Sequence, residues 1–444
     1  MRVPAAGGQP VPLTLLDSDR DDMSHRWPEF LPSGEVVVFS VREGLSPDEA
    51  SLAAVTLESG EIEHLLQGGT DPQYVPSGHL LYGRGNSLMA VPFDADRLRV
   101  TGRPVAVIDG VSGSGAGATF FAASMTGALL YQTPARQQDE LVLLDRAGDP
   151  RPLSQPSPEG RYAAPRFSPD GDRVAVQVFG GQGYSVWLYD LDRETLDPLT
   201  PTRWGMAGDP DWSADGTRVA FSTYRDRRYE LAWTAADGSG EPQVLVVDES
   251  GMRPLATSSF SPDGKVLLYH QQRTGETEWD IVALPLDTES TPTAFIATQN
   301  IEVTAAFSPD GQWVAYASDE ARDAEVYVQS YPGPGGKKRI STEGGKAPVW
   351  GPEGRELFYV NGDLLMVVEV DTGSVIAAGE PRPLFELAPG IEIQGGLVAR
   401  SYDISPDGQH FVFVRIVEGS WKPPQRILVL NWVEELKRLV PTER

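Results

Sequence analysis

The segment SPDGDRVAVQV, residues 168–178, joins a four-residue turn to a run of apolar residues. The same turn recurs as SPDG at 261–264, 308–311 and 405–408, and as SADG at 213–216. Proline pre-sets the backbone at the first corner of a type I turn, and glycine accepts the left-handed conformation that lets the next strand fold back. Each copy therefore predicts the hinge of a β-hairpin.

Looser copies of this turn extend the repeat toward both ends of the chain. They are LPSG at 31–34, VPSG at 75–78, SMTG at 124–127 and GPEG at 351–354. The closing glycines of the nine turns lie 43 to 54 residues apart and are Gly34, Gly78, Gly127, Gly171, Gly216, Gly264, Gly311, Gly354 and Gly408. A period of this length is typical of a four-stranded propeller blade.

The apolar runs that follow the turns, such as Val174–Val178 and Val266–Tyr269, barely alternate between apolar and polar residues. A strand that is apolar on both faces must be covered on both faces, as happens in a sheet that lies between two neighbouring sheets. A third strand such as 186–190 and a short fourth strand such as 197–200 complete each unit. The sequence therefore predicts an all-β chain of stacked four-stranded blades.

The two ends of the chain are predicted to share one blade. The last repeat offers three strands and then a segment with helical apolar spacing, residues 432–440, so its fourth strand is missing. The sequence of Val11–Leu16 resembles that of Asp197–Thr200, a predicted fourth strand. Val11–Leu16 is therefore expected to supply the missing strand beside Leu428. We therefore expect one propeller domain over residues 1–444, with nine blades favoured and eight as the alternative if the SMTG unit merges with a neighbour.

Composition narrows the class of partner. Lys and Arg total 37 against 63 Asp and Glu, which gives a net charge of −26, and such a surface repels nucleic acid. The absence of cysteine removes disulfides and thiolate metal sites. No run approaches the ~20 apolar residues that a membrane helix needs, and the first ten residues do not resemble a signal peptide. We expect a monomer without a membrane segment or a nucleic-acid partner.

Motifs that would indicate catalysis or metal binding are not found. No G-x-S-x-G nucleophile motif occurs, and GVSGSGAG at 110–117 has the wrong spacing. The five histidines are scattered over different repeats. DSDRDD at 17–22 begins like a calcium loop but has Asp22 where glycine is needed and Pro28 where glutamate is needed. We expect no catalytic residues and no cofactor, with weak calcium binding as an open alternative.

An acidic residue precedes the third strand in several repeats, and equivalent blades would place these residues in an arc on one rim. They are Glu140, Glu230, Asp280, Glu325 and Asp363. One hypothesis is that the arc receives cations or a basic segment of a partner. The alternative is local ion pairing with Arg225, Arg273 and Arg322, which precede three of these acids.

The SPDG turn, the strand that follows it and the aromatic strand VWLYDL at 186–191 resemble the TolB-like group of propeller repeats, which are similar to WD40 blades but lack their Gly-His and Trp-Asp signatures. Residues 325–370, 2–17, 24–34 and 429–441 look like the C-terminal propeller region of bacterial membrane-anchored serine/threonine protein kinases. Kinase motifs are absent, so kinase activity is not implied. The resemblance implies either a fragment or a stand-alone version of that region.

These observations favour a non-catalytic binding or sensing scaffold that presents loops and a central channel to a protein, peptide or glycan. The resemblance adds the sensor region of a receptor-type kinase as a specific expectation, which implies an extracytoplasmic location. The sequence as written, without an export signal, implies a cytoplasmic one. The alternative function is a hydrolase or polysaccharide lyase with its site in the channel.

Overall fold

The computed structural model describes the chain except for residues 4, 21, 44–49, 115, 154–160, 181–182, 227, 249–252, 273–278, 288–290, 334, 374, 392, 394–399 and 443–444. Nearly all of its regular structure is β-strand, and the chain divides into two compact units. The six-sheet unit comprises residues 137–421, and the three-sheet unit comprises residues 1–136 and 422–444. No helix among the described residues has the length and apolar character that a membrane crossing requires.

Five sheets of the six-sheet unit are formed from consecutive strands, innermost strand first. They are β14 (Arg161–Phe167), β15 (Arg173–Gly180), β16 (Gly183–Asp190) and β17 (Thr195–Pro198); β18 (Met206–Trp212), β19 (Arg218–Arg225), β20 (Arg228–Ala235) and β21 (Gln243–Val247); β22 (Leu255–Phe260), β23 (Val266–Gln272), β24 (Trp279–Pro285) and β25 (Thr293–Ile296); β26 (Glu302–Phe307), β27 (Trp313–Ala321), β28 (Asp323–Ser330) and β29 (Lys337–Arg339); and β30 (Lys346–Trp350), β31 (Glu356–Asn361), β32 (Leu364–Asp371) and β33 (Ala377–Ala378), with β34 (Arg382–Glu386) also paired to β32.

The sixth sheet combines the two ends of this unit. Its strands are β35 (Tyr402–Ile404), β36 (His410–Ile416), β12 (Asp139–Asp145) and β13 (Pro150–Pro152). Strand β12 pairs with β36 along its whole length, from Asp139 opposite Ile416 to Asp145 opposite His410. Residues 137–421 therefore close their own ring without the N-terminal segment.

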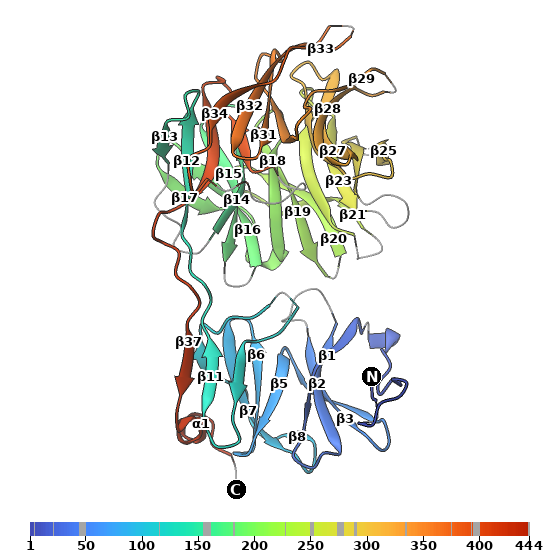
Figure 1. Ribbon diagram of the computed structural model, residues 1–444, viewed down its shortest axis with the longest axis vertical. Helices are drawn as coiled ribbons and strands as arrows, with labels where there is room; N and C mark the ends of the chain where they lie inside the picture. The colour runs from blue at the N-terminus through green and yellow to red at the C-terminus, as the bar shows by residue number, and fades with distance from the viewer. Residues whose placement is uncertain are drawn as a thin grey trace. The chain divides into compact units, whose positions relative to one another are not determined.

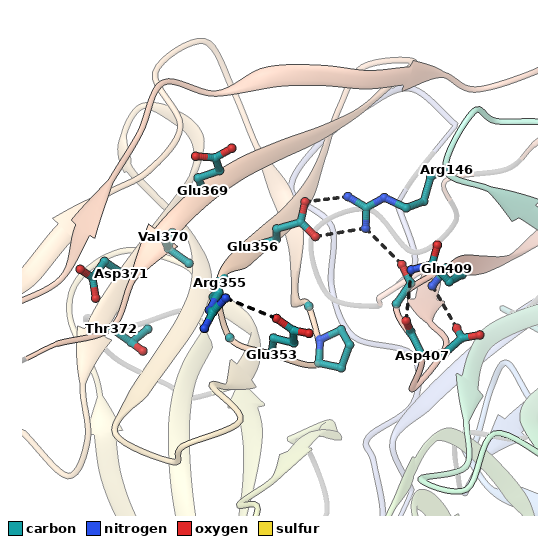
Figure 2. A pocket seen from close by; sticks show the side chains of 14 residues that line it. Arg146, Glu353, Arg355, Glu356, Glu369, Val370, Asp371, Thr372, Asp407 and Gln409 are labelled. Atoms are coloured by element: carbon teal, nitrogen blue, oxygen red, sulfur yellow. Dashed lines mark hydrogen bonds and ion pairs between the residues drawn. The ribbon is translucent and has the colours of Figure 1, made fainter.

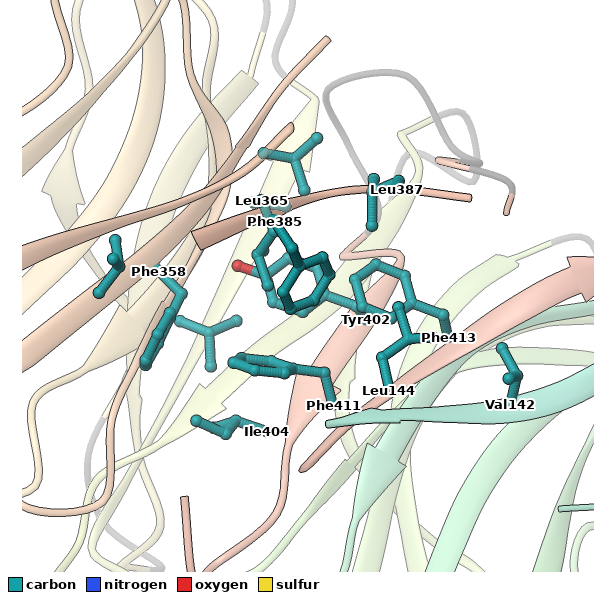
Figure 3. Close-up of a cluster of buried hydrophobic side chains, with 14 residues drawn as sticks. Val142, Leu144, Phe358, Leu365, Phe385, Leu387, Tyr402, Ile404, Phe411 and Phe413 are labelled. Atoms are coloured by element: carbon teal, nitrogen blue, oxygen red, sulfur yellow. The ribbon is translucent and has the colours of Figure 1, made fainter. Parts of the chain in front are cut away.

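Six apolar clusters fill the spaces between successive sheets of this ring. One of these clusters lies between the sheet of strands β30 to β34 and the sheet of β35, β36, β12 and β13. It includes Phe358, Phe385, Phe411 and Phe413, whose rings lie together in Figure 3. Val174, Ala175 and Val176 are fully buried although they point to alternate faces of β15. The near-continuous apolar runs of the sequence are thus strands covered on both sides.

The three-sheet unit contains two complete sheets and one shorter sheet. They are β1 (Ser24–Phe30), β2 (Val36–Arg42), β3 (Ser51–Thr56) and β4 (Ile62–Gln67); β5 (Thr70–Val75), β6 (His79–Arg84), β7 (Ser87–Asp94) and β8 (Arg99–Val100), with β9 (Val105–Asp109) also paired to β7; and β10 (Phe121–Ala123), β11 (Leu129–Gln132) and β37 (Arg426–Val429). The predicted C-terminal helix is α1 (Trp432–Leu439), and two short 3-10 turns are η1 (Ser18–Arg20) and η3 (Thr202–Trp204). Figure 1 shows the red strand β37 beside β11.

The predicted closure of the chain is wrong in its pairing. Leu428 pairs with Leu130 of β11, and Val11 pairs with Arg2. The nine turns do correspond to nine sheets in the described part of the chain, but six of these sheets close a ring among themselves. Both the nine-blade and the eight-blade prediction require each sheet to take its third strand from the segment that follows its second strand in the sequence. The chain instead leaves the SMTG sheet after β11 and returns to it with β37.

Candidate functional site

The inner strands of the six-sheet unit share one irregularity. Ala164, Asp209, Thr304 and Ala347 each lie seven residues before the closing glycine of their turn, and each has a φ between 48° and 53°. Strand register shifts at the same place in all four sheets. Such a bulge bends a strand and redirects its side chains. The repeat therefore sets a common position at which the inner strands bend.

Four of the six sheets, together with Arg400 just before β35, line a small cavity where these inner strands converge. Its lining includes Arg166, Asp209, Ser258, Thr304 and Arg400. The cavity volume is about 10 Å³, which is room for roughly one water molecule.

The charged residues at this level form what we call the axial cluster: Arg166, Arg400, Asp209, Asp211 and Asp403. The Nη2 atom of Arg400 lies 3.4 Å from Oδ1 of Asp403 and 3.8 Å from Oδ1 of Asp211. Arg166 donates to the backbone carbonyl of Arg400 at 2.9 Å. Two buried cations and three buried carboxylates therefore compensate one another across different sheets.

Burial shifts the pKa values of the axial cluster. It lowers the pKa of Arg166 to about 9, with further lowering by the nearby charge of Arg400. It raises the pKa of Asp211 to about 6, and the two arginines limit that rise. The pKa of Asp209 is also raised by burial, against a hydrogen bond from Ser222. Burial thus favours the neutral form of both carboxyl groups, against the attraction of the two arginines.

Neighbouring inner strands are joined by hydrogen bonds that recur at fixed positions. Carboxylates of Asp403 and Asp211 accept from the backbone N–H of Phe167 and Phe260 in the next sheet, at 2.9 Å and 3.1 Å. The Nε1–H of Trp212 and Trp350 donates to a carbonyl of the preceding sheet, at 3.1 Å and 3.0 Å. These bonds hold the axial cluster on a rigid frame.

The repeat turns form a second ring, at the ends of the inner strands. The proline of one turn lies against the closing glycine of the next, as Pro169 does against Gly216 and Pro309 against Gly354. The SADG turn has Ala214 in place of proline. The closing glycine of the next turn, Gly264, therefore has no proline against it, and nothing lies within 4 Å of the place where a side chain on Gly264 would begin. We call this side of the six-sheet unit the turn face.

A basin of about 870 Å³ lies on the turn face, between the GPEG turn and the SPDG turn at 405–408. In Figure 2, Arg146 extends to Glu356, and its guanidinium donates two hydrogen bonds to that carboxylate, at 2.6 Å and 3.1 Å. It also donates to the carbonyl of Gly408 at 3.1 Å. The basin is therefore a polar hollow whose floor is fixed by an ion pair.

Carboxylates outnumber cations in the lining of the basin. Besides the Arg146–Glu356 pair, Arg355 lies 3.8 Å from Glu353. Glu369 and Asp371 alternate with buried Val370 along β32 and are exposed. Within the described residues, no lysine or arginine forms an ion pair with Glu369 or Asp371. The basin therefore has a net negative charge.

The predicted acidic residues occupy equivalent places at the start of third strands, but four of the five are buried. Glu140, Glu230, Asp280 and Glu325 expose 9%, 6%, 0% and 4% of their surface, whereas Asp363 is exposed. Glu140 forms an ion pair with Arg415 at 2.6 Å, and Glu230 forms one with Arg225 at 3.0 Å. Glu325 accepts a hydrogen bond from Ser341. The Arg225–Glu230 pair is the predicted local one, whereas Arg322 forms no ion pair with Glu325 in the described part of the chain. Arg273 lies outside the described residues, and ligand binding at the arc stays a prediction.

The other motifs from the sequence are placed as follows. In the acidic turn, Asp17 accepts a hydrogen bond from the backbone of Asp19 at 3.0 Å, and Asp22 lies 3.2 Å from His25; Asp21 is outside the described residues. In the loop at 110–117, Gly113 bridges to Thr119, and residue 115 is not described. Among the described residues, no three His, Asp or Glu side chains gather as metal ligands.

Comparisons with known proteins agree with this architecture. A family model described as "TolB beta propeller domain" matches residues 209–376. The solved structure of a putative TolB from Agrobacterium tumefaciens superimposes with a TM-score of 0.51 and 19% identity, covering 63% of this chain and 99% of that one. This chain contains a TolB-like propeller.

Two further similarities are more distant. TolB from Acinetobacter baumannii has a TM-score of 0.42 and 14% identity, covering 78% of this chain and 81% of that one. An uncharacterized protein of Agrobacterium fabrum is 24% identical over 268 residues, which is 57% of this chain and 84% of that protein. The likeness of fold rests on the Agrobacterium tumefaciens structure, and at 19% identity it shows the fold alone and no ligand.

Proposed function

We propose that this chain is a non-catalytic binding scaffold whose turn face receives a basic segment of a partner protein or peptide. The observation that carries the proposal is the basin between the GPEG and SPDG turns, at about 870 Å³. A volume of this order suits a ligand that is buried in part, such as a few residues of an extended segment. The hydrogen bonds between inner strands keep the surrounding turns in place, so little ordering is required on binding.

The negative charge of the basin favours one class of ligand. The exposed carboxylates of Glu369 and Asp371 lie at the edge of a hollow in which the arginines already have acidic partners. The whole chain has a net charge of −26, which accelerates encounters with cationic partners and slows encounters with anionic ones. A lysine- or arginine-bearing segment is therefore favoured over an acidic peptide or a phosphorylated ligand.

The same proposal extends to a sensor region of a receptor-type protein kinase. Its support is the similarity of residues 325–370 and 429–441 to the propeller regions of such kinases. In that setting the basin would face the extracytoplasmic space, and ligand binding would be the sensed event. A cytoplasmic location is the corresponding proposal for a chain that acts alone.

A catalytic function is the second candidate, and the axial cluster is the observation that favours it. Asp211 has its pKa raised to about 6 by burial and lies near two arginines, which is a combination found in active sites. Against it, the adjoining cavity holds about 10 Å³ and offers no room for a substrate. Mutual neutralisation of buried charges accounts for the cluster without catalysis.

Charge reversal in the basin tests the binding function. Glu369→Lys with Asp371→Lys is expected to weaken binding of a fluorescent lysine- and arginine-rich decapeptide about tenfold or more, measured by anisotropy in 50 mM salt. Asp192→Lys with Asp197→Lys, on the exposed hairpin between β16 and β17, is the matched control and should bind as the parent chain does. Equal loss in both variants, or no loss in the first, would refute the basin as the binding site.

A further inference from the structure

The three-sheet unit resembles half of the ring formed by the six-sheet unit. Within the described residues, one apolar cluster joins the β1–β4 sheet to the β5–β9 sheet, and another joins the β5–β9 sheet to the β10–β11–β37 sheet and α1. No apolar cluster joins the first sheet of this stack to the third in the described part of the chain. The stack therefore has two ends, whereas the six-sheet ring has none.

One end of the stack is an uncovered sheet face. Phe120, Leu130, Leu428 and Leu430 have exposed fractions of 41%, 42%, 61% and 68%. Leu130 and Leu428 are directly opposite each other in the β11–β37 pair, so their side chains lie on the same face. Faces of this kind are buried against the next sheet throughout the six-sheet unit.

The same end has no outermost strand. The β10–β11–β37 sheet has three strands, and no described residue pairs with the free edge of β37. The other eight sheets in the described part of the chain have four or five strands. An open edge of this kind accepts an added strand.

Chain order indicates which segment fits that edge. Around the ring, an outermost strand is followed directly by the innermost strand of the next sheet, as β17 is followed by β18 and β21 by β22. Val11–Leu16 directly precedes β1, the innermost strand of its sheet. By this rule, Val11–Leu16 has the position of an outermost strand in a sheet that would stack before β1–β4.

At the N-terminal end of the stack, the outer face of the β1–β4 sheet is covered, since Val37, Phe39 and Val41 are at most 4% exposed, and the apolar groups left exposed there belong to the N-terminal segment. Arg2 and Val11 exchange backbone hydrogen bonds at 2.7 Å and 2.8 Å, and Leu13 packs on the outer face of the β1–β4 sheet. Val11 and Leu15 still expose 47% and 77% of their surface. Asp17 and Asp19 follow this segment, and Arg426 is exposed on β37.

We propose that the three-sheet units of two copies of this chain close a six-sheet ring, in which Val11–Leu16 of each copy lies beside β37 of the other. Three sheets from each copy give the number of sheets that closes the ring of residues 137–421. A two-fold axis lets each apolar end meet the opposite end of the partner, so both interfaces form together. The proposal concerns the three-sheet unit and is independent of the basin on the six-sheet unit.

Sedimentation equilibrium of the full chain tests the stoichiometry. A dimer is expected in place of the monomer that the sequence suggested, and Leu428→Glu should weaken it about tenfold or more because a charge replaces a leucine that the dimer interface would bury. Val375→Glu is the matched control, since Val375 is 77% exposed and lies in the six-sheet unit. A chain that stays monomeric at all concentrations, or a dimer that Leu428→Glu leaves intact, would overturn the proposal.

Cross-linking tests the arrangement, because the chain has no cysteine of its own. One sample carries Leu15→Cys and another carries Leu428→Cys, and the two are mixed and treated with a bis-maleimide. Cross-linked pairs of one variant with the other are expected, and pairing of Leu428→Cys with the control Val375→Cys is not. A partner of another kind on the β37 face would appear as a monomer without cross-links, which contradicts the proposal.

Discussion

Proline in the repeat turns acts on two sheets at once. It fixes the backbone of its own turn, and it lies against the closing glycine of the next turn around the ring, as Pro262 does against Gly311. That glycine has a φ of 71°, where a side chain is strained. The SPDG sequence is therefore suited both to the hairpin and to the contact between hairpins.

Replacing Ala214 by proline is expected to stabilise the protein. The turn at 213–216 has the same hydrogen bond as its proline-containing counterparts, from Gly216 N–H to the carbonyl of Ser213 at 2.9 Å. Proline at this corner reduces the freedom of the unfolded chain, which contributes about 0.4–1 kcal/mol. Urea unfolding of Ala214→Pro measures the gain. Pro262→Ala is the reciprocal control and should lose a similar amount; a destabilised Ala214→Pro would contradict the expected backbone fit.

The aspartates of the repeat turns make the stability of the folded protein depend on pH. Hydrogen bonds from Ser261 and from the backbone of Lys265 hold the pKa of Asp263 at about 2, below its ordinary value of 3.8. A carboxylate with a lowered folded-state pKa stabilises the protein above pH 3.8, and this contribution is lost as pH falls toward 2.

Asp263→Asn should therefore be less stable than the parent chain at pH 7 and equally stable near pH 2, as judged from urea midpoints. The exposed Glu380→Gln controls for removal of a surface charge. A difference for Asp263→Asn that stays constant across this pH range would show that the turn carboxylate is not the titrating group.

At the scale of strands, neighbouring sheets are joined by hydrogen bonds, which are directional, as well as by apolar packing, which is not. The indole of Trp350 donates to the carbonyl of Ala306 in the preceding sheet, and both groups are buried. Trp350→Phe keeps most of the apolar volume but leaves that carbonyl without its donor, which costs about 1–3 kcal/mol. Thermal and urea unfolding measure the loss.

Trp233→Phe is the matched control for this loss. Its indole donates to Gln243 at an exposed site, where water replaces the lost partner. Similar losses in the two variants would mean that aromatic packing, and not the bond between sheets, stabilises the interface.

The strands show what could be predicted from local sequence and what could not. The nine turn glycines all have positive φ, from 67° at Gly216 to 94° at Gly127, as their sequence context predicts. Hairpins depend on adjacent residues. The pairing of β12 with β36 joins residues such as Glu140 and Arg415, and nothing in the local pattern shows which distant strand a segment joins.

The candidate sites also differ in how much of each can be predicted from local sequence. The third-strand acids were found from their recurrence, but their burial is set by neighbouring strands such as β36, which brings Arg415 to Glu140. The axial cluster was missed, although Arg166, Asp211 and Asp403 each lie five residues before a closing glycine. A tabulation of polar residues by distance from that glycine would have indicated it.

At the scale of the whole molecule, residues 137–421 are expected to fold without the rest of the chain. Their ends are already adjacent, since Val417 N–H donates to the carbonyl of Gln138 at 2.9 Å and β12 pairs with β36. The isolated segment should melt within about 4 °C of the matching transition in the full chain, or roughly 1 kcal/mol for a unit of this size. Circular dichroism and calorimetry check this; an unfolded or aggregated product would show that the segment depends on residues outside it.

The position of β37 after the six-sheet unit has a consequence during synthesis. Strand β11 leaves the ribosome well before its partner, because about 285 residues lie between the two parts of the three-sheet unit. At roughly 5–20 residues per second, that interval lasts about 15–60 s. Throughout it the nascent chain holds an unpaired hairpin while a whole ring is translated and folds behind it. The β10–β11–β37 sheet and the six-sheet ring are therefore both completed late, because β36 of the ring ends at Ile416 and β37 begins at Arg426, whereas the β1–β4 and β5–β9 sheets have all their strands before β10 is translated.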